Sequence, residues 1–542
     1  YYALQRKSRG NLGYGKRQQS TLEGTLTFQH KFGELLDMNL MAGMGRYLDS
    51  GDGSDISYEN ANDHIQGSSV GMADGPFYPT SYKYKNEKRS QFVRGSFDLF
   101  GRYVVSASLR RDGTDKFFPS KKYALFPSVS LAWKMNEESF IKNISWINML
   151  KLRASYGETG SDNLGTTLYG IVTTTREDVQ FNNNSVTYIP YILSGANYED
   201  VTWQKTVMKN IGLDFSIFRD RIWGSVDVFR NDVTHLLGTA PTELLGMHGT
   251  RPINGGHYKR TGIDVSLNSL NLQTHDFKWT SQITMSHYNA VWIERMPNYD
   301  YQKYQKRKNE PMNAFYYYKT TGIIDMDKSN MPESQRSLGP AACMPGYPIV
   351  EDKNGDGIID VNDSYMDNML PKLYFGFGNT FTWKNFDLDI FMYGQLGVKK
   401  WNDAYSYSAD AGNLSRGVDA HNVGIYSYNI WNTQTNMNGH FPGIAISKSV
   451  ALPENLGFDY TRENASYVRV RNITLGYNLG PKELSIFKGY IRGIRVFVDF
   501  QNPLTFTKYK GYDPEINTSS SNLTGGQYPQ MRVYSIGAKL TF

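Results

Sequence analysis

The sequence has a single cysteine, Cys343, among its 542 residues. An intramolecular disulfide is therefore excluded, and a metal site built on cysteines is not expected. Hydrophobic residues make up only 39% of the chain, and no apolar run approaches the ~20 residues that a membrane-spanning helix needs. The net charge of +6 is small for this length, and no long block of Lys or Arg marks a nucleic-acid surface. We expect no nucleic-acid partner.

Catalytic signatures are missing as well. The sequence contains no G-x-S-x-G, H-E-x-x-H or P-loop pattern. His248 and His257 lie in one segment but lack the i, i+4 spacing of a zinc-binding helix. Carboxylate pairs such as Glu137 and Glu138 are too common in proteins to indicate hydrolysis. The sequence therefore predicts no catalytic residue and no enzymatic activity.

Aromatic residues and glycine are abundant, with 39 Tyr, 28 Phe and 51 Gly, a composition that suits strands better than helical bundles. The dominant pattern has a period of two. In VRGSFDLF, Val93 and Phe97 fall on one face and Arg94 on the other, and the alternation resumes at Tyr103 after a tight corner. Such segments predict hairpins with one apolar and one polar face.

The alternation predicts an all-β fold of fifteen antiparallel strands. The connections between them are alternately short and long, and two of the longest are 290–372 and 397–465. A transmembrane β-barrel has this rhythm, because its periplasmic turns are short and its extracellular loops long. The apolar face then meets lipid and the polar face a watery lumen. The strands are expected near 21–32, 37–46, 91–100, 103–112, 123–135, 148–157, 206–218, 222–230, 258–269, 276–289, 373–383, 386–396, 466–478, 492–502 and 531–542.

Strand parity yields a further expectation. The final segment, VYSIGAKLTF, ends on the aromatic Phe542 and follows a long connection, so the C-terminus is expected on the periplasmic side. The first predicted strand runs in the same direction. A closed barrel with an even number of strands then needs an odd number before residue 21. Because Tyr1 begins in mid-pattern, we expect an upstream part of a longer chain.

Five stretches of the chain carry motifs of a known family. They are SASLRRDGTDKFFPSKKYALFPSVSLAWKMNEESF (106–140), LKLRASYGETGSDN (150–163), VTWQKTVMKNIGLDFSIFRDRIWGSVDVF (201–229), ENASYVRVRNITLGYNL (463–479) and VFVDFQNPLTFTKYKGYDPEI (496–516). Together they resemble the SusC-like branch of the TonB-dependent outer-membrane transporters of Bacteroidetes. Two departures occur: Gln204 where the family often has Glu, and Pro503 within QNPLTFT. The similarity covers the chain from about residue 90 to its end.

The resemblance implies more than the periodicity does. Family members have 22 strands around an N-terminal plug, so residues 1–542 would form the C-terminal fifteen strands, with seven strands and the plug upstream. A SusD-like surface lipoprotein would cap the barrel as a hinged lid. The pair would import oligomers, chiefly glycan oligosaccharides, with energy relayed by TonB–ExbB–ExbD. Two such pairs would associate side by side in the lipid of the cell outer membrane.

The stretch DKNGDGIIDVND, residues 352–363, has oxygen-bearing side chains at the spacing of a calcium loop. It lies in the 290–372 connection without flanking helices, which argues against a calcium sensor. Three interpretations stay open: a structural Ca²⁺ clip, a site that touches substrate or lid, and a metal-free acidic turn. The candidate ligands are Asp352, Asn354, Asp356, Asp360 and Asp363, with the backbone carbonyl of Ile358.

Aromatic side chains in the long loops are the candidate substrate contacts. They occur in FYYYKTTG (315–322) and WNDAYSYSADAG (401–412), and the residues singled out are Tyr316, Tyr317, Trp401 and Tyr405. Their rings could stack on sugars, but such rings also fill loop packing.

The rival functions are an importer of oligopeptides or of a chelate, a non-transporting glycan-binding adhesin, and a secreted hydrolase. An acidic dyad in a cleft would mark the last of these.

Overall fold

A computed structural model gives the fold of the chain. The structure describes residues 9–59, 75–164, 173–174, 179–180, 187–188, 191–192, 199–241, 250–297, 299, 301–307, 309–401, 429–439, 441–443, 452–460, 462–481, 483–487, 490–511, 513–516 and 529–542.

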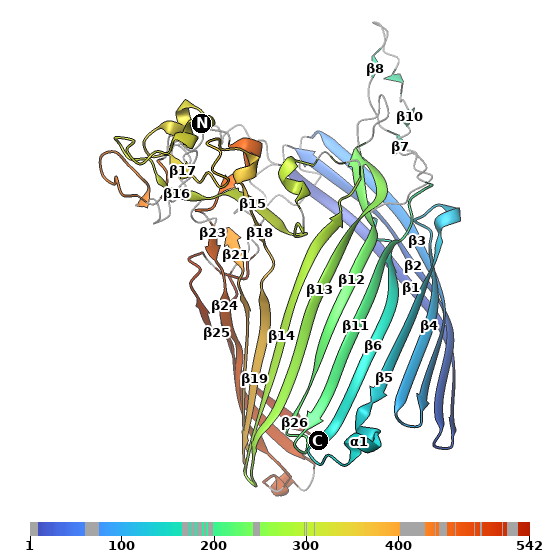
Figure 1. The fold of residues 1–542 in the computed structure, drawn as a ribbon. Coiled ribbons are helices and arrows are strands. Elements are labelled where there is room, and N and C mark those ends of the chain that lie inside the picture. The colour runs from blue at the N-terminus through green and yellow to red at the C-terminus, as the bar shows by residue number, and fades with distance from the viewer. Residues whose placement is uncertain are drawn as a thin grey trace.

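One fifteen-stranded sheet forms a curved wall, with long strands running between two ends (Figure 1). Each strand pairs antiparallel with the next wall strand along the chain, and β1 and β26 are the edges of the sheet. The predicted number of strands and their antiparallel order are confirmed. The wall strands are β1 (Arg9–Phe32), β2 (Leu36–Glu59), β3 (Phe77–Leu99), β4 (Tyr103–Thr114), β5 (Tyr123–Lys134), β6 (Ile147–Ser161), β11 (Gln204–Ile217), β12 (Ile222–Pro241), β13 (Thr250–Gln273), β14 (Phe277–Glu294), β19 (Leu373–Trp383), β20 (Phe386–Leu396), β24 (Tyr467–Leu479), β25 (Gly493–Thr507) and β26 (Val533–Thr541).

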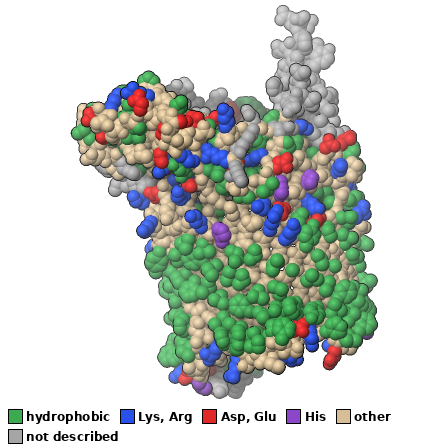
Figure 2. Space-filling model, in the orientation of Figure 1, with side chains coloured by type: hydrophobic (Ala, Val, Ile, Leu, Met, Phe, Trp, Pro, Cys, Tyr) green, Lys and Arg blue, Asp and Glu red, His purple; other side chains and the backbone are tan. Residues whose placement is uncertain are grey.

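The outer face of the wall is apolar. Figure 2 shows a broad hydrophobic band over the strands, with Lys and Arg side chains gathered above it. Ile211 is 62% exposed, Leu109 44% and Leu540 50%, and Phe97 is half-buried with no second layer described over it. Exposed apolar side chains in a continuous band fit a lipid-facing surface. Among the described residues, no helix is long and apolar enough to cross a membrane.

The inner face carries ion pairs instead. Arg153 donates to both oxygens of Asp214, at 2.9 and 2.7 Å, and to Asp227 at 3.0 Å. These groups come from β6, β11 and β12, at the sequence positions that alternate with exposed apolar residues such as Ile211 and Val228. Charged side chains of this kind need water or partners nearby. The predicted assignment of a polar face to the lumen therefore agrees with the structure.

Aromatic pairs collect where the short turns join the strands. Trp146 stacks with Phe218 at 5.7 Å between ring centroids, and Trp383 stacks with Phe386 at 6.0 Å. Phe386 also contacts the ring of Tyr477 at 4.7 Å. Amphipathic rings at this level are typical of the membrane–water interface. They mark the turn side of the wall as one border of the lipid band.

Several strands extend well past their predicted ends, chiefly on the long-loop side. The wall begins at Arg9 where the alternation predicts residue 21, and β2 and β3 cover most of the predicted 47–90 connection. The extra length is held by polar pairs such as Arg17 with Asp49, at 2.9 and 2.8 Å. Beyond the lipid band both faces meet water, so the apolar alternation disappears while strand pairing continues.

The described parts of the two longest connections, 290–372 and 397–465, fold together into a lobe at one end of the wall (Figure 1). Apolar cores hold it, one around Tyr318, Val350, Ile359 and Leu452 and another around Tyr347. The long connections therefore contain short strands and apolar cores of their own. Their elements are β15 (Ala314–Tyr318), β18 (Tyr365–Asn368) and β22 (Gly457–Phe458) in one sheet, β16 (Thr320–Ile323) with β17 (Pro348–Val350), and β21 (Lys399–Trp401) with β23 (Arg462–Asn464).

The remaining short elements lie elsewhere. A single helical turn precedes β6, and two pairs of two-residue strands lie between β6 and β11. These elements are α1 (Ser139–Lys142), β7 (Thr173–Thr174) with β10 (Tyr191–Ile192), and β8 (Val179–Gln180) with β9 (Thr187–Tyr188).

Candidate functional site

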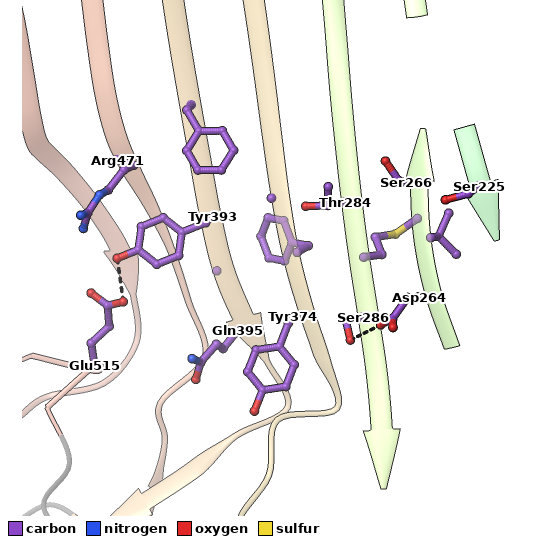
Figure 3. Close-up of a pocket in the computed structure, with 16 residues that line it drawn as sticks. Ser225, Asp264, Ser266, Thr284, Ser286, Tyr374, Tyr393, Gln395, Arg471 and Glu515 are labelled. Atoms are coloured by element: carbon purple, nitrogen blue, oxygen red, sulfur yellow. Dashed lines mark hydrogen bonds between the residues drawn. The ribbon is translucent and has the colours of Figure 1, made fainter. Parts of the chain in front are cut away.

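A pocket of about 780 Å³ lies against the inner side of the wall, where β12, β13, β14, β19, β20 and β24 run side by side (Figure 3). We call it the inner-wall pocket. Its polar groups come from alternate residues of each strand, the face opposite the lipid band. The pocket is lined by Ser225, Asp264, Val265, Ser266, Thr284, Met285, Ser286, Tyr374, Phe375, Gly376, Phe391, Tyr393, Gly394, Gln395, Arg471 and Glu515.

Strand register brings these residues together. Asp264 pairs with Ser286, Ser286 with Tyr374, and Tyr374 with Gln395, so four strands contribute one continuous inner row. From β13 to β24 there are four strand spacings, or about 19 Å at ~4.8 Å each. The pocket is therefore long enough to contact several units of an oligomer rather than one small molecule.

A glycine opens the middle of this row. A Cβ on Gly376 would lie 2.8 Å from Oγ1 of Thr284 and 3.2 Å from the ring of Phe391. Any larger residue would push one of them aside and fill the floor of the pocket. The glycine therefore keeps the space between the two tyrosine rings, Tyr374 and Tyr393, open.

A buried ion-pair cluster closes one end of the pocket. Arg469 is 2% exposed, and its guanidinium lies 2.8 Å from Asp513 and 2.5 Å from Glu515. The hydroxyls of Tyr393 and Tyr467 donate to the same Glu515 carboxylate, at 2.6 and 2.8 Å. The segment after β25 is therefore fixed to β20 and β24, and the Glu515 carboxylate is held by two hydroxyl donors and the Arg469 cation.

The other end of the pocket is less enclosed. The hydroxyl of Ser286 donates to Asp264 at 2.6 Å. The ring of Tyr374 stacks on Tyr288 with centroids 5.7 Å apart and planes at 1°, and Arg260 lies 4.4 Å over the Tyr288 ring. Stacked tyrosines with hydroxyl, amide and carboxylate groups beside them offer both ring faces and hydrogen bonds. Such a wall can bind a sugar or a peptide without any reaction taking place.

Tyr316 and Tyr317, two of the predicted substrate contacts, lie in the lobe on β15. The Tyr316 hydroxyl donates to the buried Glu310, and burial raises the pKa of Tyr316. Tyr317 is 8% exposed, stacked on Phe315 and Tyr365, and burial followed by the charge of Asp367 raises the pKa of Tyr317 to about 12. These contacts favour a structural role in the lobe, and substrate contact by either ring stays a prediction.

The other two aromatic candidates lie further along the chain. The backbone of Trp401 belongs to β21, where it pairs with Arg462 of β23, and Tyr405 lies outside the described residues. Substrate contact by Trp401 and by Tyr405 therefore also stays a prediction.

The predicted calcium loop also lies in the lobe, and its oxygens accept bonds from the loop's own backbone. Asp352 accepts from the amides of Gly355 and Gly357 at 2.7 and 2.9 Å. Asp363, fully buried, accepts from the amides of Lys353 and Asp360 at 2.9 and 2.8 Å. Across the described chain, no group of three or more His, Cys, Asp or Glu side chains is placed to share a metal ion.

The rest of the predicted ligand set follows the same arrangement. Asn354 and Asp356 bond each other, the amide of Ile358 donates to Asp356 at 2.9 Å, and Asp360 caps the turn at Asn362. The donor set has the chemistry that Ca²⁺ prefers. In this geometry, however, the oxygens stabilise the turn and do not converge, so Ca²⁺ would need several of these bonds to be exchanged.

None of the pocket residues was predicted as a site. Three of them, Ser225, Arg471 and Glu515, lie in family stretches quoted above, but nothing in those stretches marked them as site residues. The pocket residues on the strands are spread over more than 200 positions, and strand register brings them together.

An antiparallel meander with a lipid-facing outside, a polar inside and a pocket on the inner wall defines an outer-membrane β-barrel protein. Residues 1–502 match the family model described as "TonB dependent receptor-like, beta-barrel". The chain belongs to this family.

Curated relatives agree with this assignment. The chain is 27% identical to the TonB-dependent receptor P3 of Formosa agariphila, over 98% of this chain and 53% of that protein. It is 27% identical to the TonB-dependent receptor SusC of Bacteroides thetaiotaomicron, over 85% of this chain and 44% of that protein. The chain thus spans about half the length of the curated relatives it matches. The suspected SusC-like membership and the outer-membrane location are confirmed.

Among solved structures, the RagAB peptide transporter matches with a TM-score of 0.77 at 21% identity, over 98% of this chain and 56% of that one. The same importer in its closed-closed state matches with a TM-score of 0.76. At this level of identity the likeness establishes the fold.

Proposed function

We propose that the chain forms part of the wall of an active importer that carries oligomeric nutrients across the outer membrane. The observation that carries the proposal is the inner-wall pocket, about 780 Å³ in volume and set in the lumen side of a lipid-facing wall. A pocket across several strands can hold a polymer segment in transit. Energy would come from TonB–ExbB–ExbD, in keeping with the family name. We assign the protein no catalytic role.

Glycan oligosaccharides are the proposed cargo. The rings of Tyr374 and Tyr393 flank the space over Gly376, and Asp264 and Gln395 supply hydrogen-bonding groups beside them. This mixture of aromatic faces and planar polar groups suits the alternating apolar and hydroxyl surfaces of sugar rings. The resemblance to the SusC-like family described in the sequence analysis implies the same class of cargo. An oligopeptide cargo is the second candidate, because the fold matches that of a structure titled the RagAB peptide transporter.

The proposed partners are a SusD-like surface lipoprotein that covers the barrel and a second transporter–lipoprotein pair alongside. The folded lobe supports the first of these. Its apolar cores and the buried Arg462, which pairs with Asp367 at 2.9 Å and lies 4.2 Å over Phe315, give a rigid surface at the loop side of the wall. A rigid surface lowers the entropic cost of docking a lid. A Ca²⁺ ion in the 352–363 turn is proposed as an additional structural clip in this lobe.

The function is tested by uptake of fluorescently labelled oligosaccharides into a host that expresses the intact gene with its neighbouring lipoprotein gene. Import is expected with a working TonB system and not in a strain lacking TonB. Tyr374→Ala should reduce uptake, whereas Tyr103→Ala, at the turn side of the wall, should not. Surface binding without TonB-dependent import would instead favour the adhesin, and import of labelled peptides alone would favour the second candidate. Import of a metal chelate but of no oligomer would favour the third.

A further inference from the structure

Arg471 is the extra residue of a β-bulge in β24. Phe391 and Met392 are neighbours on β20, yet their partners on β24 are Asn472 and Val470. The register against β25 shifts at the same place. A bulge inserts one unpaired residue and turns its side chain away from the regular alternation. Here Arg471 is exposed and points to the inner-wall pocket beside Tyr393 (Figure 3).

The neighbouring strand β25 is also irregular next to the bulge. Opposite Arg471, β25 carries Asn502 with a φ of 51° and then Pro503. Proline has no N–H to give to the ladder, so it is tolerated where pairing is already interrupted. The side-chain amide of Asn502 donates to the carbonyl of Met531 at 3.0 Å, which holds the left-handed residue in place. The distortion is therefore part of the wall on both strands.

The charges around Arg471 leave it as an excess cation. Arg469 contacts Asp513 and Glu515, and the ammonium of Lys400 donates to the backbone carbonyls of the segment that carries both carboxylates. Two cations thus balance two carboxylates within this cluster. Three charged side chains line the pocket: Asp264, Arg471 and Glu515. The charge of Glu515 is balanced by the cluster, and Asp264 on β13 lies about 19 Å from β24, across four strand spacings. Arg471 therefore gives its end of the pocket a net positive charge.

We propose that Arg471 binds an anionic group of the cargo, so that the transporter prefers acidic oligosaccharides that carry carboxylate or sulfate groups. This inference rests on the proposed function and names the substrate class of its pocket. A guanidinium presents parallel N–H donors that match a carboxylate or sulfate. Asp264 at the far end of the pocket disfavours the same anion there, which orients the chain within the pocket.

The test uses the intact gene product, purified in detergent, with three variants: Arg471→Gln, Arg471→Lys and Arg94→Gln. Arg94 is an exposed arginine of β3 and serves as the matched control. Isothermal titration compares tetragalacturonate with its methyl ester, which keeps the sugar backbone and loses the charge. A sulfated oligosaccharide, and a tetrapeptide with its C-terminal amide, complete the set.

We expect Arg471→Gln to bind tetragalacturonate about tenfold more weakly or worse, the range expected for a lost charge-assisted hydrogen bond. Binding of the methyl ester should stay unchanged, Arg471→Lys should keep part of the preference, and Arg94→Gln should behave as the parent. Equal binding of tetragalacturonate by Arg471→Gln and the parent would overturn the proposal. So would an equal loss for acid and ester.

The source of the anion is distinguished by the other probes. A preference for the sulfated oligosaccharide over the uronate keeps the proposal and identifies sulfate as the group. If only the peptide acid binds in an Arg471-dependent manner, the carbohydrate part of the inference is overturned. If neutral oligosaccharides enter cells with TonB and Arg471→Gln changes nothing, the inference fails while the proposed function stands.

Discussion

Replacement of Ile211 by lysine is the most direct test of the idea that lipid surrounds the wall. Ile211 is 62% exposed and forms a row across neighbouring strands with Ala154, Val228 and Ile263. In water, an exposed isoleucine could be replaced by lysine at almost no cost in stability. In hydrocarbon, the ammonium would lose its hydration, and the same change would be strongly destabilising.

The expected magnitude follows from the depth of Ile211 in the band. It lies six residues before Ile217, where β11 ends at the turn side. At ~3.4 Å per residue and a tilt of about 45°, six residues place it roughly 14 Å above the turns. Half of a hydrocarbon layer is about 15 Å, so Ile211 lies near the midplane. Lysine there should cost about 2–4 kcal/mol of folding free energy in a bilayer.

Ser155→Lys is the matched control. Ser155 follows Ala154, the partner of Ile211, so it lies at the same depth, but it is exposed on the inner face. Urea titrations of the protein folded into phospholipid vesicles, read by the gel mobility of the folded barrel, should show a large loss for Ile211→Lys and a small change for Ser155→Lys. Equal changes for the two variants would refute the assignment of lipid to one face.

Three further predictions concern the cluster and the lobe. Arg469→Met, which leaves two carboxylates buried without their cation, should lower the free energy of unfolding by about 3–5 kcal/mol, seen as a lower thermal midpoint; an unchanged midpoint would mean that the cluster is solvated. In the lobe, Asp356→Ala combined with Asp360→Ala should abolish Tb³⁺ luminescence at the acidic turn if that turn binds Ca²⁺, and a parent protein that never binds Tb³⁺ would end the calcium proposal. Burial alone would raise the pKa of Asp367, but Lys399 and Arg462 outweigh it and hold the pKa of Asp367 below its usual value. The stabilisation from Asp367 is thus present above the unfolded pKa of about 3.9 and lost as the pH falls through the lowered value. The protection factors of the β18 amides, which compare each exchange rate with the intrinsic rate at the same pH, should therefore fall at low pH in the parent and stay constant in Asp367→Asn.

The number and order of the wall strands could be predicted because two solvents act on them at once. Where lipid meets one face and water the other, residues such as Val93 and Arg94 must alternate. That constraint ends at the border of the bilayer. Past that border, β1 and β2 continue as a polar pair of strands in which Arg17 donates hydrogen bonds to Asp49. In this part the sequence has no alternation of apolar and polar residues that would distinguish the strands from a loop.

The lobe shows a different limit of the sequence. The acidic residues of the turn at Asp352 and the tyrosines around Tyr317 have the composition of a binding site. In the structure, however, they form hydrogen bonds with neighbouring groups of the same lobe. Asp352 accepts two backbone amides, and Tyr317 donates to Asp367 at 3.1 Å. Composition cannot separate a side chain that binds a ligand from one that stabilises a long loop, because the same hydrogen bonds serve both purposes.

The register of the strands explains why the pocket could not be predicted from the sequence. It also indicates which residues should determine the choice of cargo. Asp264, Tyr374 and Gln395 are more than 100 residues apart at the extremes and meet only because four strands, β13, β14, β19 and β20, pair in one alignment. Arg471 adds a residue that obeys no alternation, since a bulge turns it inward. A wall of this kind can change its cargo by substitutions on the inner face alone, without any cost to the lipid-facing rows. Substitutions at Arg471 should therefore alter charge preference while strand pairing is preserved. A deletion of Arg471 would instead remove the bulge and make Val470 and Asn472 consecutive partners of Met392 and Phe391, so that β24 keeps its faces against β20 but loses the cation of the pocket.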